Sequence, residues 1–129
     1  MTPSPVPAKQ AAERAGRWAE RLAAWRLRLS GYRVVARNYR SPAGEIDLVV
    51  RRGRTLVFVE VKARASLAAA VEAIRPGQQR RIRNAATSFL ARYPNLGGHD
   101  LRFDVVLVVP GRLPRHLADA WRDSDSWTR

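Results

Sequence analysis

Three acidic residues and one lysine fall on two neighbouring segments that have the alternation of β-strands. Glu45 and Asp47 lie two residues apart in the first segment, and Glu60 and Lys62 lie two residues apart in the second. Residues two apart in a strand point to the same face of a sheet. Carboxylates gathered in this way repel one another unless a proton or a divalent cation offsets their charge, and hard oxygen ligands suit Mg²⁺. The spacing therefore indicates a metal-dependent hydrolytic site.

Lys62 is unusual because almost all of the other basic residues are arginine. The sequence contains 24 Lys and Arg residues, and only Lys9 and Lys62 among them are lysine. Arg is a permanently charged planar fork, whereas Lys is a compact charge whose pKa its surroundings can move. We infer that position 62 needs a property that Arg does not supply. The plainer alternative is a solvent-exposed lysine at the end of a strand.

The turn between the two segments decides which side chains face each other. If Gly53-Arg54 forms a two-residue turn, Asp47 stands directly opposite Glu60, and Glu45 stands opposite Lys62. A turn longer by two residues would place Glu45 opposite Glu60 and keep the shared face, whereas a one-residue change would destroy it. The alternative is an ordinary solvated sheet face on which Glu45 and Lys62 form a surface ion pair.

The chemistry that this arrangement favours is phosphodiester hydrolysis. Asp47 and Glu60 would hold Mg²⁺, with Mn²⁺ as a substitute, helped by the backbone carbonyl of Val61. The metal would lower the pKa of a bound water and bind the scissile phosphate. Lys62 would orient or deprotonate that water, or counter the charge that develops on the phosphorane, and Glu45 would tune Lys62.

The composition points to a polyanion as the partner. The formal net charge is +13 and the isoelectric point is about 11.7, so we expect nucleic acid, DNA more than RNA, although an acidic membrane surface or ribosomal RNA would also fit. The absence of cysteine and the presence of two histidines exclude disulfides, thiolate metal sites and a His-rich zinc cage. We find no apolar run that could span a bilayer and no signal sequence, so we expect no membrane partner and a cytoplasmic protein.

The elements that must position these residues follow from apolar periodicity and turn residues. We expect one domain over residues 11–122, a flexible tail over 1–10 and a frayed end over 123–129. Helices are predicted from about Ala8 to Ser30 and from about Pro76 to Arg92, with a short helix over 116–122. Strands are predicted over 32–38, 45–51, 55–63 and 101–109. The long connection before the last strand favours parallel pairing there, and the first three strands form an antiparallel meander.

Both long helices carry a basic flank beside apolar residues. On the first helix the arginines that share one arc are Arg14, Arg17, Arg21 and Arg28. On the second helix they are Arg80, Arg81 and Arg83, and the residues expected to face inward are Ile82, Ala86, Phe89 and Leu90. Trp18, Trp25 and Trp121 could supply apolar contacts for a partner or a dimer, although tryptophans at helical spacing are more often buried in the core.

The two acidic segments resemble a known family. The run Gly44-Glu45-Ile46-Asp47-Leu48-Val49, followed by Phe58-Val59-Glu60-Val61-Lys62-Ala63-Arg64, resembles the YraN-type family of uncharacterised bacterial proteins. That family is similar to the PD-(D/E)xK nuclease superfamily, which includes restriction endonucleases and archaeal Holliday-junction resolvases. The resemblance covers about residues 13–122 and extends to Gly16, Glu20, Ala23, Leu27, Gly31-Tyr32, Arg37-Asn38-Tyr39-Arg40 and Arg102-Phe103-Asp104.

The resemblance implies an α/β fold with a restriction-endonuclease-like core. The elements would follow the order αβββαβ, and helices would flank a mixed sheet. Mg²⁺ would be bound by Asp47 and Glu60, with Lys62 as the catalytic lysine. The resemblance also implies that Glu20 reaches the site from the first helix, while a boundary glutamate paired with Arg17 is an equally good account of that residue.

Two further positions follow from the same comparison. Many relatives carry Lys-Gln where this chain has Gln78-Gln79, so the chain keeps hydrogen-bonding groups there but lacks a charge near the phosphate path. Asp104 is expected to be structural and to pair with an arginine at the start of a strand.

The leading hypothesis is a Mg²⁺-dependent nuclease that acts on DNA, including branched or recombination intermediates. The alternative is a non-catalytic nucleic-acid-binding protein with a vestigial nuclease site, in which the arginine flanks track phosphates. Two-fold junction substrates would favour a homodimer. The residues expected to bind substrate are Gln78, Gln79, Arg80, Arg81, Arg83 and Glu45.

Overall fold

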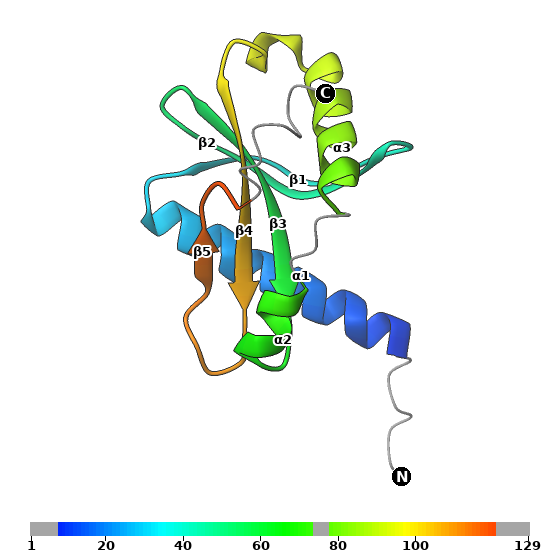
Figure 1. Cartoon of the computed structure of the whole chain (residues 1–129), viewed down its shortest axis with the longest axis vertical. Coiled ribbons are helices and arrows are strands. Elements are labelled where there is room, and N and C mark those ends of the chain that lie inside the picture. Colours follow the sequence, from blue (N-terminus) through cyan, green and yellow to red (C-terminus); the bar gives the residue numbers. More distant parts are fainter. Residues whose placement is uncertain (1–7, 74–77, 121–129) are drawn as a thin grey trace.

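A mixed five-stranded sheet forms the middle layer of the molecule, with α1 on one face and α2 and α3 on the other (Figure 1). The computed structural model describes residues 8–73 and 78–120, and only the backbone of residues 8–15 and 78. The elements are α1 (Ala8–Leu29), β1 (Arg33–Ser41), β2 (Gly44–Arg52), β3 (Thr55–Ala63), α2 (Leu67–Glu72), α3 (Gln78–Arg92), a 3₁₀ turn (Pro94–Leu96), β4 (Asp100–Val108) and β5 (Arg115–Leu117).

The strand order in the sheet is the same as the order along the chain. β1, β2 and β3 form an antiparallel meander, and β5 runs antiparallel to β4. β3 and β4 are parallel over their whole length, because the connection that contains α2 and α3 carries the chain back across the sheet. The predicted meander and the predicted parallel pair are both confirmed.

Each face of the sheet has its own apolar core. The α1 side is built from small helix residues, Ala19, Ala23 and Ala24 with Leu27, against valines of the inner strands. The α3 side is built around aromatic rings, and Phe58 lies between Phe89 of α3 and Phe103 of β4 at ring-centroid distances of 5.9 and 5.3 Å. β4 is buried from Phe103 onward, as expected for a strand that is covered on both faces.

The tryptophans of α1 lie outside this core. Trp18 and Trp25 are 56% and 45% exposed, so burial, the commoner fate of such residues, is the wrong interpretation for both. The helix packs closely on the sheet through alanines, and the larger rings are left on the outer side. Trp121 lies outside the described residues, and a role for these rings in partner or dimer contacts stays a prediction.

Two short elements differ from the expectation. The segment predicted to be helical over 116–122 overlaps strand β5 at Arg115–Leu117, and its last two residues lie outside the described part. His116 Nε2 lies 2.6 Å from Asp104 Oδ2, and this contact holds the segment alongside β4. The helix α2 was not predicted, although Ser66 gives it a side-chain cap by accepting a hydrogen bond from the Ala69 N–H.

No helix in the described ranges is long and apolar enough to cross a membrane.

The first turn of α1 overlaps the flexible tail that was expected over 1–10, since the helix begins at Ala8.

Candidate functional site

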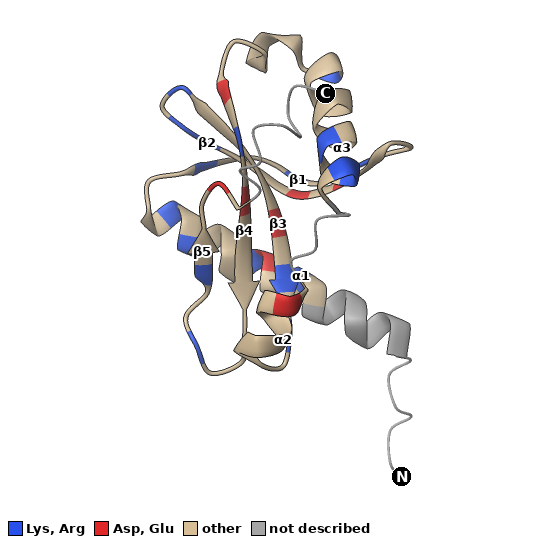
Figure 2. Ribbon diagram, in the orientation of Figure 1, with Lys and Arg blue, Asp and Glu red and all other residues tan. Residues whose placement is uncertain are grey.

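The β2–β3 hairpin brings the acidic segments together at the end away from its turn. Figure 2 shows acidic positions of β2 and β3 near the basic start of α3. Gly53 has a φ of 60°, which suits a tight two-residue turn, and Arg52 pairs with Thr55 as predicted. The paired residues continue in this register only as far as Leu48 and Val59. The two strands therefore separate at Asp47 and Glu60, the next residue on each strand.

The opening between the strands corrects one detail of the expected pairing. Asp47 and Glu60 follow the last paired residues in register, but no backbone pairing joins them. Instead, the Val61 N–H donates a hydrogen bond of 2.7 Å to Asp47 Oδ2. A side chain of β2 thus takes the place of the next backbone acceptor and ties the two strands together across the gap.

The same point is an irregularity within β2. Ile46 packs in the α3-side core and Leu48 in the α1-side core, although residues two apart in a regular strand share one face. On β1, the residue across from Asp47 is Asn38, whose φ is 50°. Asn tolerates this left-handed conformation better than most residues. The local reversal leaves Asp47 at a point from which it interacts with groups on both sides of the sheet.

Lys62 is held by Glu60. The Lys62 Nζ lies 2.7 Å from Glu60 Oε1, and the side chains are 8% and 19% exposed. The predicted Glu45–Lys62 pair is therefore wrong: Glu45 is exposed and lies 3.9 Å from Arg40 across the β1–β2 hairpin. The strands diverge before the register would bring Glu45 opposite Lys62. Lys62 therefore pairs with Glu60, which lies on its own strand.

Asp47 is the most strongly perturbed acid of the site. Burial, together with the nearby charges of Glu20 and Glu60, raises the pKa of Asp47 to about 6. The hydrogen bond from Val61 and the charge of Lys62 act in the opposite direction. Like charges around a buried carboxyl make its ionised form unfavourable, and a nearby cation would offset them.

Glu20 of α1 acts on Asp47 through its charge, and the part in the site that the resemblance implied for Glu20 stays a prediction. Burial raises the pKa of Glu20, while a hydrogen bond from the Asn38 side chain and the charges of Arg37, Arg40 and Arg17 lower it. The effect of Glu20 on Asp47 shows that the two carboxylates lie close enough to repel. The alternative account, a pairing with Arg17, describes only part of its surroundings.

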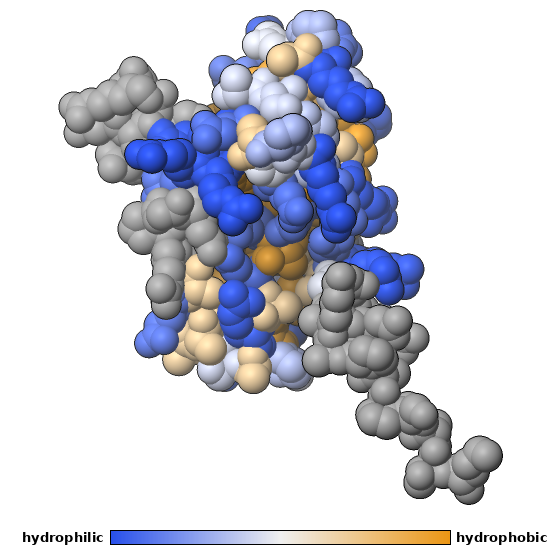
Figure 3. Space-filling view, turned by 90° about the vertical axis from the view of Figure 1, so that its right-hand side faces the viewer, coloured by the Kyte–Doolittle hydropathy of each residue, from blue (hydrophilic) through white to orange (hydrophobic). Residues whose placement is uncertain are grey.

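A small pocket opens on the α3 side of these acids. It has a volume of about 150 Å³ and is lined by Glu45, Asp47, Glu60, Arg81 and Ile82. The three acids of the two strands thus share one pocket, as their spacing predicted. The β1–β2 turn is pressed against α3, because a Cβ at Gly44 would lie 2.7 Å from the Arg81 carbonyl oxygen. Viewed from the side that carries α3, the molecule shows hydrophilic residues around an apolar recess (Figure 3).

The other residues expected to bind substrate lie at the start of α3. Arg80 and Arg81 are exposed, and Arg83 is half-buried with its Nε donating to the Gln79 carbonyl at 3.4 Å. Of this set, Arg81 lines the pocket with the acids. The Gln78 side chain lies outside the described part of the structure.

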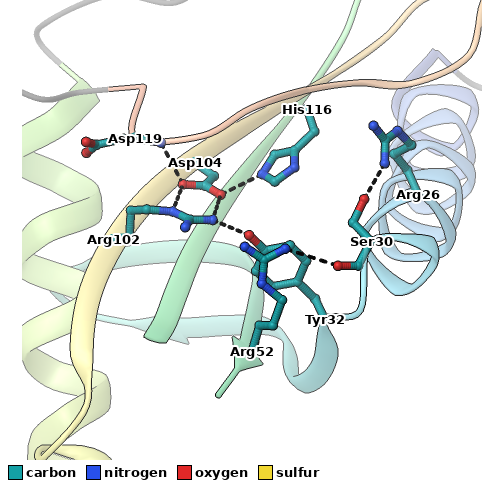
Figure 4. Close-up of polar contacts among 8 residues, drawn as sticks. All are labelled: Arg26, Ser30, Tyr32, Arg52, Arg102, Asp104, His116 and Asp119. Carbon is teal, nitrogen blue, oxygen red and sulfur yellow. Dashed lines mark hydrogen bonds and ion pairs between the residues drawn. The ribbon is translucent and has the colours of Figure 1, made fainter. Parts of the chain in front are cut away.

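Asp104 occupies a separate and fully buried position on β4 (Figure 4). Arg102 donates two hydrogen bonds to its carboxylate, at 2.8 and 2.7 Å, and also donates to the Tyr32 hydroxyl. His116 donates from Nε2 at 2.6 Å, and the Asp119 N–H donates at 2.8 Å. The expectation that Asp104 pairs with an arginine near a strand start is confirmed, and we call this group the Asp104 cluster.

Comparisons with known proteins place the chain in a protein family. Residues 19–108 match the model described as uncharacterised protein family UPF0102. The chain belongs to this family. A UPF0102 protein of Parvibaculum lavamentivorans is 66% identical over 83 residues, which is 64% of this chain and 62% of that protein. UPF0102 proteins of Paramagnetospirillum magneticum and Maricaulis maris are 54% and 51% identical over 122 and 119 residues, which is 92% of this chain in each case and 95% and 94% of theirs.

The part of the chain that matches UPF0102 contains the whole site. It begins one residue before Glu20 and includes Asp47, Glu60, Lys62 and Asp104, while β5 lies beyond its end. The site of this UPF0102 protein is thus built within the matched region, from α1, β2 and β3.

The donor groups fit a hard cation in one respect. Asp47 Oδ1 has no hydrogen-bond partner within the described residues, and the acids around it disfavour its charge. A divalent cation prefers such carboxylate oxygens. However, no three His, Cys, Asp or Glu residues of the described ranges are arranged to enclose a metal ion. Of the three acids on the strands of the UPF0102 site, Asp47 and Glu60 are the two expected to hold a cation, and its remaining ligands would be backbone or water oxygens.

Sequence reasoning assigned no role to three residues around Glu20, which are Asn38, Arg40 and Gly16. Asn38 bonds Glu20, and all three line a second hollow described below. Asn within a predicted strand was the available signal, since Asn is depleted from strands and tolerates positive φ.

Proposed function

We propose that this protein is a metal-dependent nuclease that hydrolyses phosphodiester bonds in DNA, including branched or recombination intermediates. The observation that carries the proposal is the convergence of Asp47, Glu60 and Lys62 where β2 and β3 separate. Two acids can hold a divalent cation that activates water, and a buried lysine can counter the charge that develops on the phosphate.

Each residue has a distinct part in this proposal. Asp47 and Glu60 would hold Mg²⁺ or Mn²⁺, with the Val61 carbonyl as a further oxygen, and the bound ion would supply a water of lowered pKa and a Lewis acid. The buried Lys62 ammonium, held at 2.7 Å from Glu60, would orient the attacking water and counter the negative charge that develops on phosphorus. Glu20 would orient water or a further cation ligand from the α1 side.

We propose further that the core is restriction-endonuclease-like. α1, β1, β2, β3, α3 and β4 follow the order predicted for such a core, and α2 and β5 are additions to it. The parallel β3–β4 pair and the meander before it are consistent with that arrangement.

The charge of the chain supports nucleic acid as the substrate. The formal net charge is +13, and exposed arginines stand on both sides of the acids, with Arg81 at the start of α3 and Arg40 on β1. Positive charge attracts phosphates and speeds encounter with a polyanion. The local negative charge of the acids requires that a cation accompany the phosphate into the pocket.

Cleavage assays test the proposal directly. Supercoiled plasmid, a four-way DNA junction and a matched RNA duplex are incubated with the protein in Mg²⁺, in Mn²⁺ and in EDTA. We expect metal-dependent cleavage of DNA that falls by about 100-fold or more in Asp47→Asn and Lys62→Gln. Glu72→Gln is the control, because Glu72 is an exposed acid on α2 outside the pocket.

Two results would contradict the proposal. Cleavage that is equal in wild type, Asp47→Asn and Lys62→Gln would assign the activity to another site or to a contaminant. Binding of DNA that persists in EDTA, with no cleavage and no heat of Mg²⁺ or Mn²⁺ binding by calorimetry, would favour the non-catalytic binding protein.

A further inference from the structure

A second hollow lies on the α1 side of the acids. It has a volume of about 490 Å³ and is lined by Gly16, Arg17, Glu20, Asn38 and Arg40. We call it the α1–β1 hollow, because its walls come from one face of the helix and from the outer strand. Glu20 connects the two hollows, since it lines this one and repels Asp47, which lines the other.

Gly16 is a residue that the packing of the helix does not require. Gly weakens the interior of a helix relative to Ala, and Gly16 lies well inside α1. A Cβ at this position would meet nothing within 4 Å, so no neighbouring group excludes a side chain. Its lack of a side chain keeps the wall of the α1–β1 hollow open, which is an advantage only if something enters.

The charges around the hollow favour an anion. The guanidinium groups of Arg17, Arg37 and Arg40 all act on Glu20, so three positive charges surround one carboxylate. Arg40 and Arg17 are exposed, and both line the hollow. Guanidinium groups bind phosphate oxygens through two parallel hydrogen bonds, a geometry that a single carboxylate does not saturate.

We propose that the α1–β1 hollow binds the backbone phosphates of a nucleic-acid strand next to the bond that the acids would cleave. The choice of nucleic acid rests on the proposed function. In this arrangement Arg17 and Arg40 hold the strand on one side of Asp47, and Arg81 meets it on the other. Asn38 acts as a positioning residue, because its left-handed backbone and its hydrogen bond to Glu20 fix the wall between the two hollows.

Binding measurements without metal test the hollow separately from catalysis. Fluorescence anisotropy of a labelled single-stranded oligodeoxynucleotide and of a labelled four-way junction is measured in EDTA over a series of salt concentrations. In Arg17→Gln and in Arg40→Gln we expect affinity to fall about fivefold at 0.1 M salt, and the salt slope to fall by about 0.7 for the single strand. Arg33→Gln is the control, because Arg33 is an exposed arginine at the opposite end of β1.

Gly16 gives a test whose two readouts move in opposite directions. Gly16→Ala and Gly16→Gln should each raise the midpoint of thermal unfolding by about 2–6 °C, because both replace glycine in a helix. Gly16→Gln should nevertheless bind the oligodeoxynucleotide at least about fivefold more weakly, with Gly16→Ala between it and wild type. A glycine with only a structural role would not show this opposition.

The outcomes separate this inference from the proposed function. If wild type and all hollow variants bind DNA equally, or if polyglutamate binds through Arg17 and Arg40 while DNA does not, the inference is overturned even where Asp47 proves essential for cleavage. If the hollow variants lose binding while no variant or wild type cleaves, the hollow is supported and the proposed nuclease is rejected.

Discussion

Two aspartates of the same sheet show opposite ways of burying a carboxylate. Asp104 is 0% exposed, and burial alone would raise its pKa, but hydrogen bonds from His116, Arg102 and the Asp119 N–H outweigh burial and lower it. Burial and two nearby acids raise the pKa of Asp47 to about 6, and its one backbone hydrogen bond does not offset them. The first carboxylate is satisfied as an anion, and the second is not.

The difference separates a structural role from a candidate functional one. The buried charge of the Asp104 cluster joins β4, β5 and Tyr32, which precedes β1, and both oxygens of the Asp104 carboxylate accept hydrogen bonds. At Asp47 the fold holds like charges together, and the Val61 hydrogen bond and the charge of Lys62 do not fully offset burial and the neighbouring acids. A bound cation would stabilise the ionised form of Asp47, which is what the proposed metal-dependent function needs.

Removing the charge of Asp104 should have the largest effect on stability. In Asp104→Asn the half-buried Arg102 guanidinium loses its fully buried anion, and breaking a buried pair costs about 3–5 kcal/mol. Urea unfolding at pH 7 measures the loss. The same substitution at Asp47 is the matched comparison, and we expect it to leave stability equal or higher. Equal losses in the two variants would remove the distinction drawn between the two carboxylates.

The pH dependence of stability should reveal the penalty at Asp47. The pKa of Asp47 in the folded state is about 6, above its ordinary value of 3.8, so the folded state binds the proton more tightly than the unfolded state does. Its contribution to stability is therefore present below pH 4 and is lost as the pH rises through 6. We expect the difference in unfolding free energy between Asp47→Asn and wild type to grow in favour of the variant by up to about 3 kcal/mol from pH 4 to pH 7.

The control for this experiment is Asp100→Asn, which removes one charge at an exposed position at the start of β4. A gain of the same size and shape in that variant would trace the effect to net charge and not to the surroundings of Asp47. Measurements in EDTA keep contaminating cations from reversing the sign.

Local patterns predicted much of the fold. The limits of β3 and the Gly53 turn follow from apolar residues and one glycine, and they fixed a register that the structure confirms at Arg52 and Thr55. The position of the acids on neighbouring strands followed from the same register. The parallel placement of β4 followed from the long connection between β3 and β4, because parallel neighbours need a crossover of this kind.

The remaining features depend on contacts between distant residues. The partner of Lys62 could not be predicted from an ideal hairpin, because the strands separate beyond Leu48 and the lysine turns to Glu60. The strand at Arg115–Leu117 forms because His116 meets Asp104, a contact over 12 residues that leaves no periodicity in the local sequence. The exposure of Trp18 likewise depends on which face of α1 packs against the sheet.

The smallest expected effect concerns the outer part of the Asp104 cluster. In Tyr32→Phe the ring keeps its place in the α1-side core, but Arg102 loses the hydrogen bond to the hydroxyl while it keeps both bonds to Asp104. The matched variant is Tyr39→Phe, which breaks a bond of 2.7 Å between two neutral hydroxyls, those of Tyr39 and Ser88. A hydrogen bond to a charged group contributes about 1.5–3 kcal/mol and a neutral one about 1 kcal/mol.

We therefore expect urea unfolding to show a loss of about 1.5 kcal/mol in Tyr32→Phe and a smaller one in Tyr39→Phe. Combining Tyr32→Phe with Asp104→Asn should give less than the sum of the separate losses, because both changes act on Arg102. Strict additivity, or a larger loss at Tyr39, would show that Asp104 and its arginine are stable without their neighbours. The contrast with Asp47 would then rest on one ion pair, without a contribution from the wider network around it.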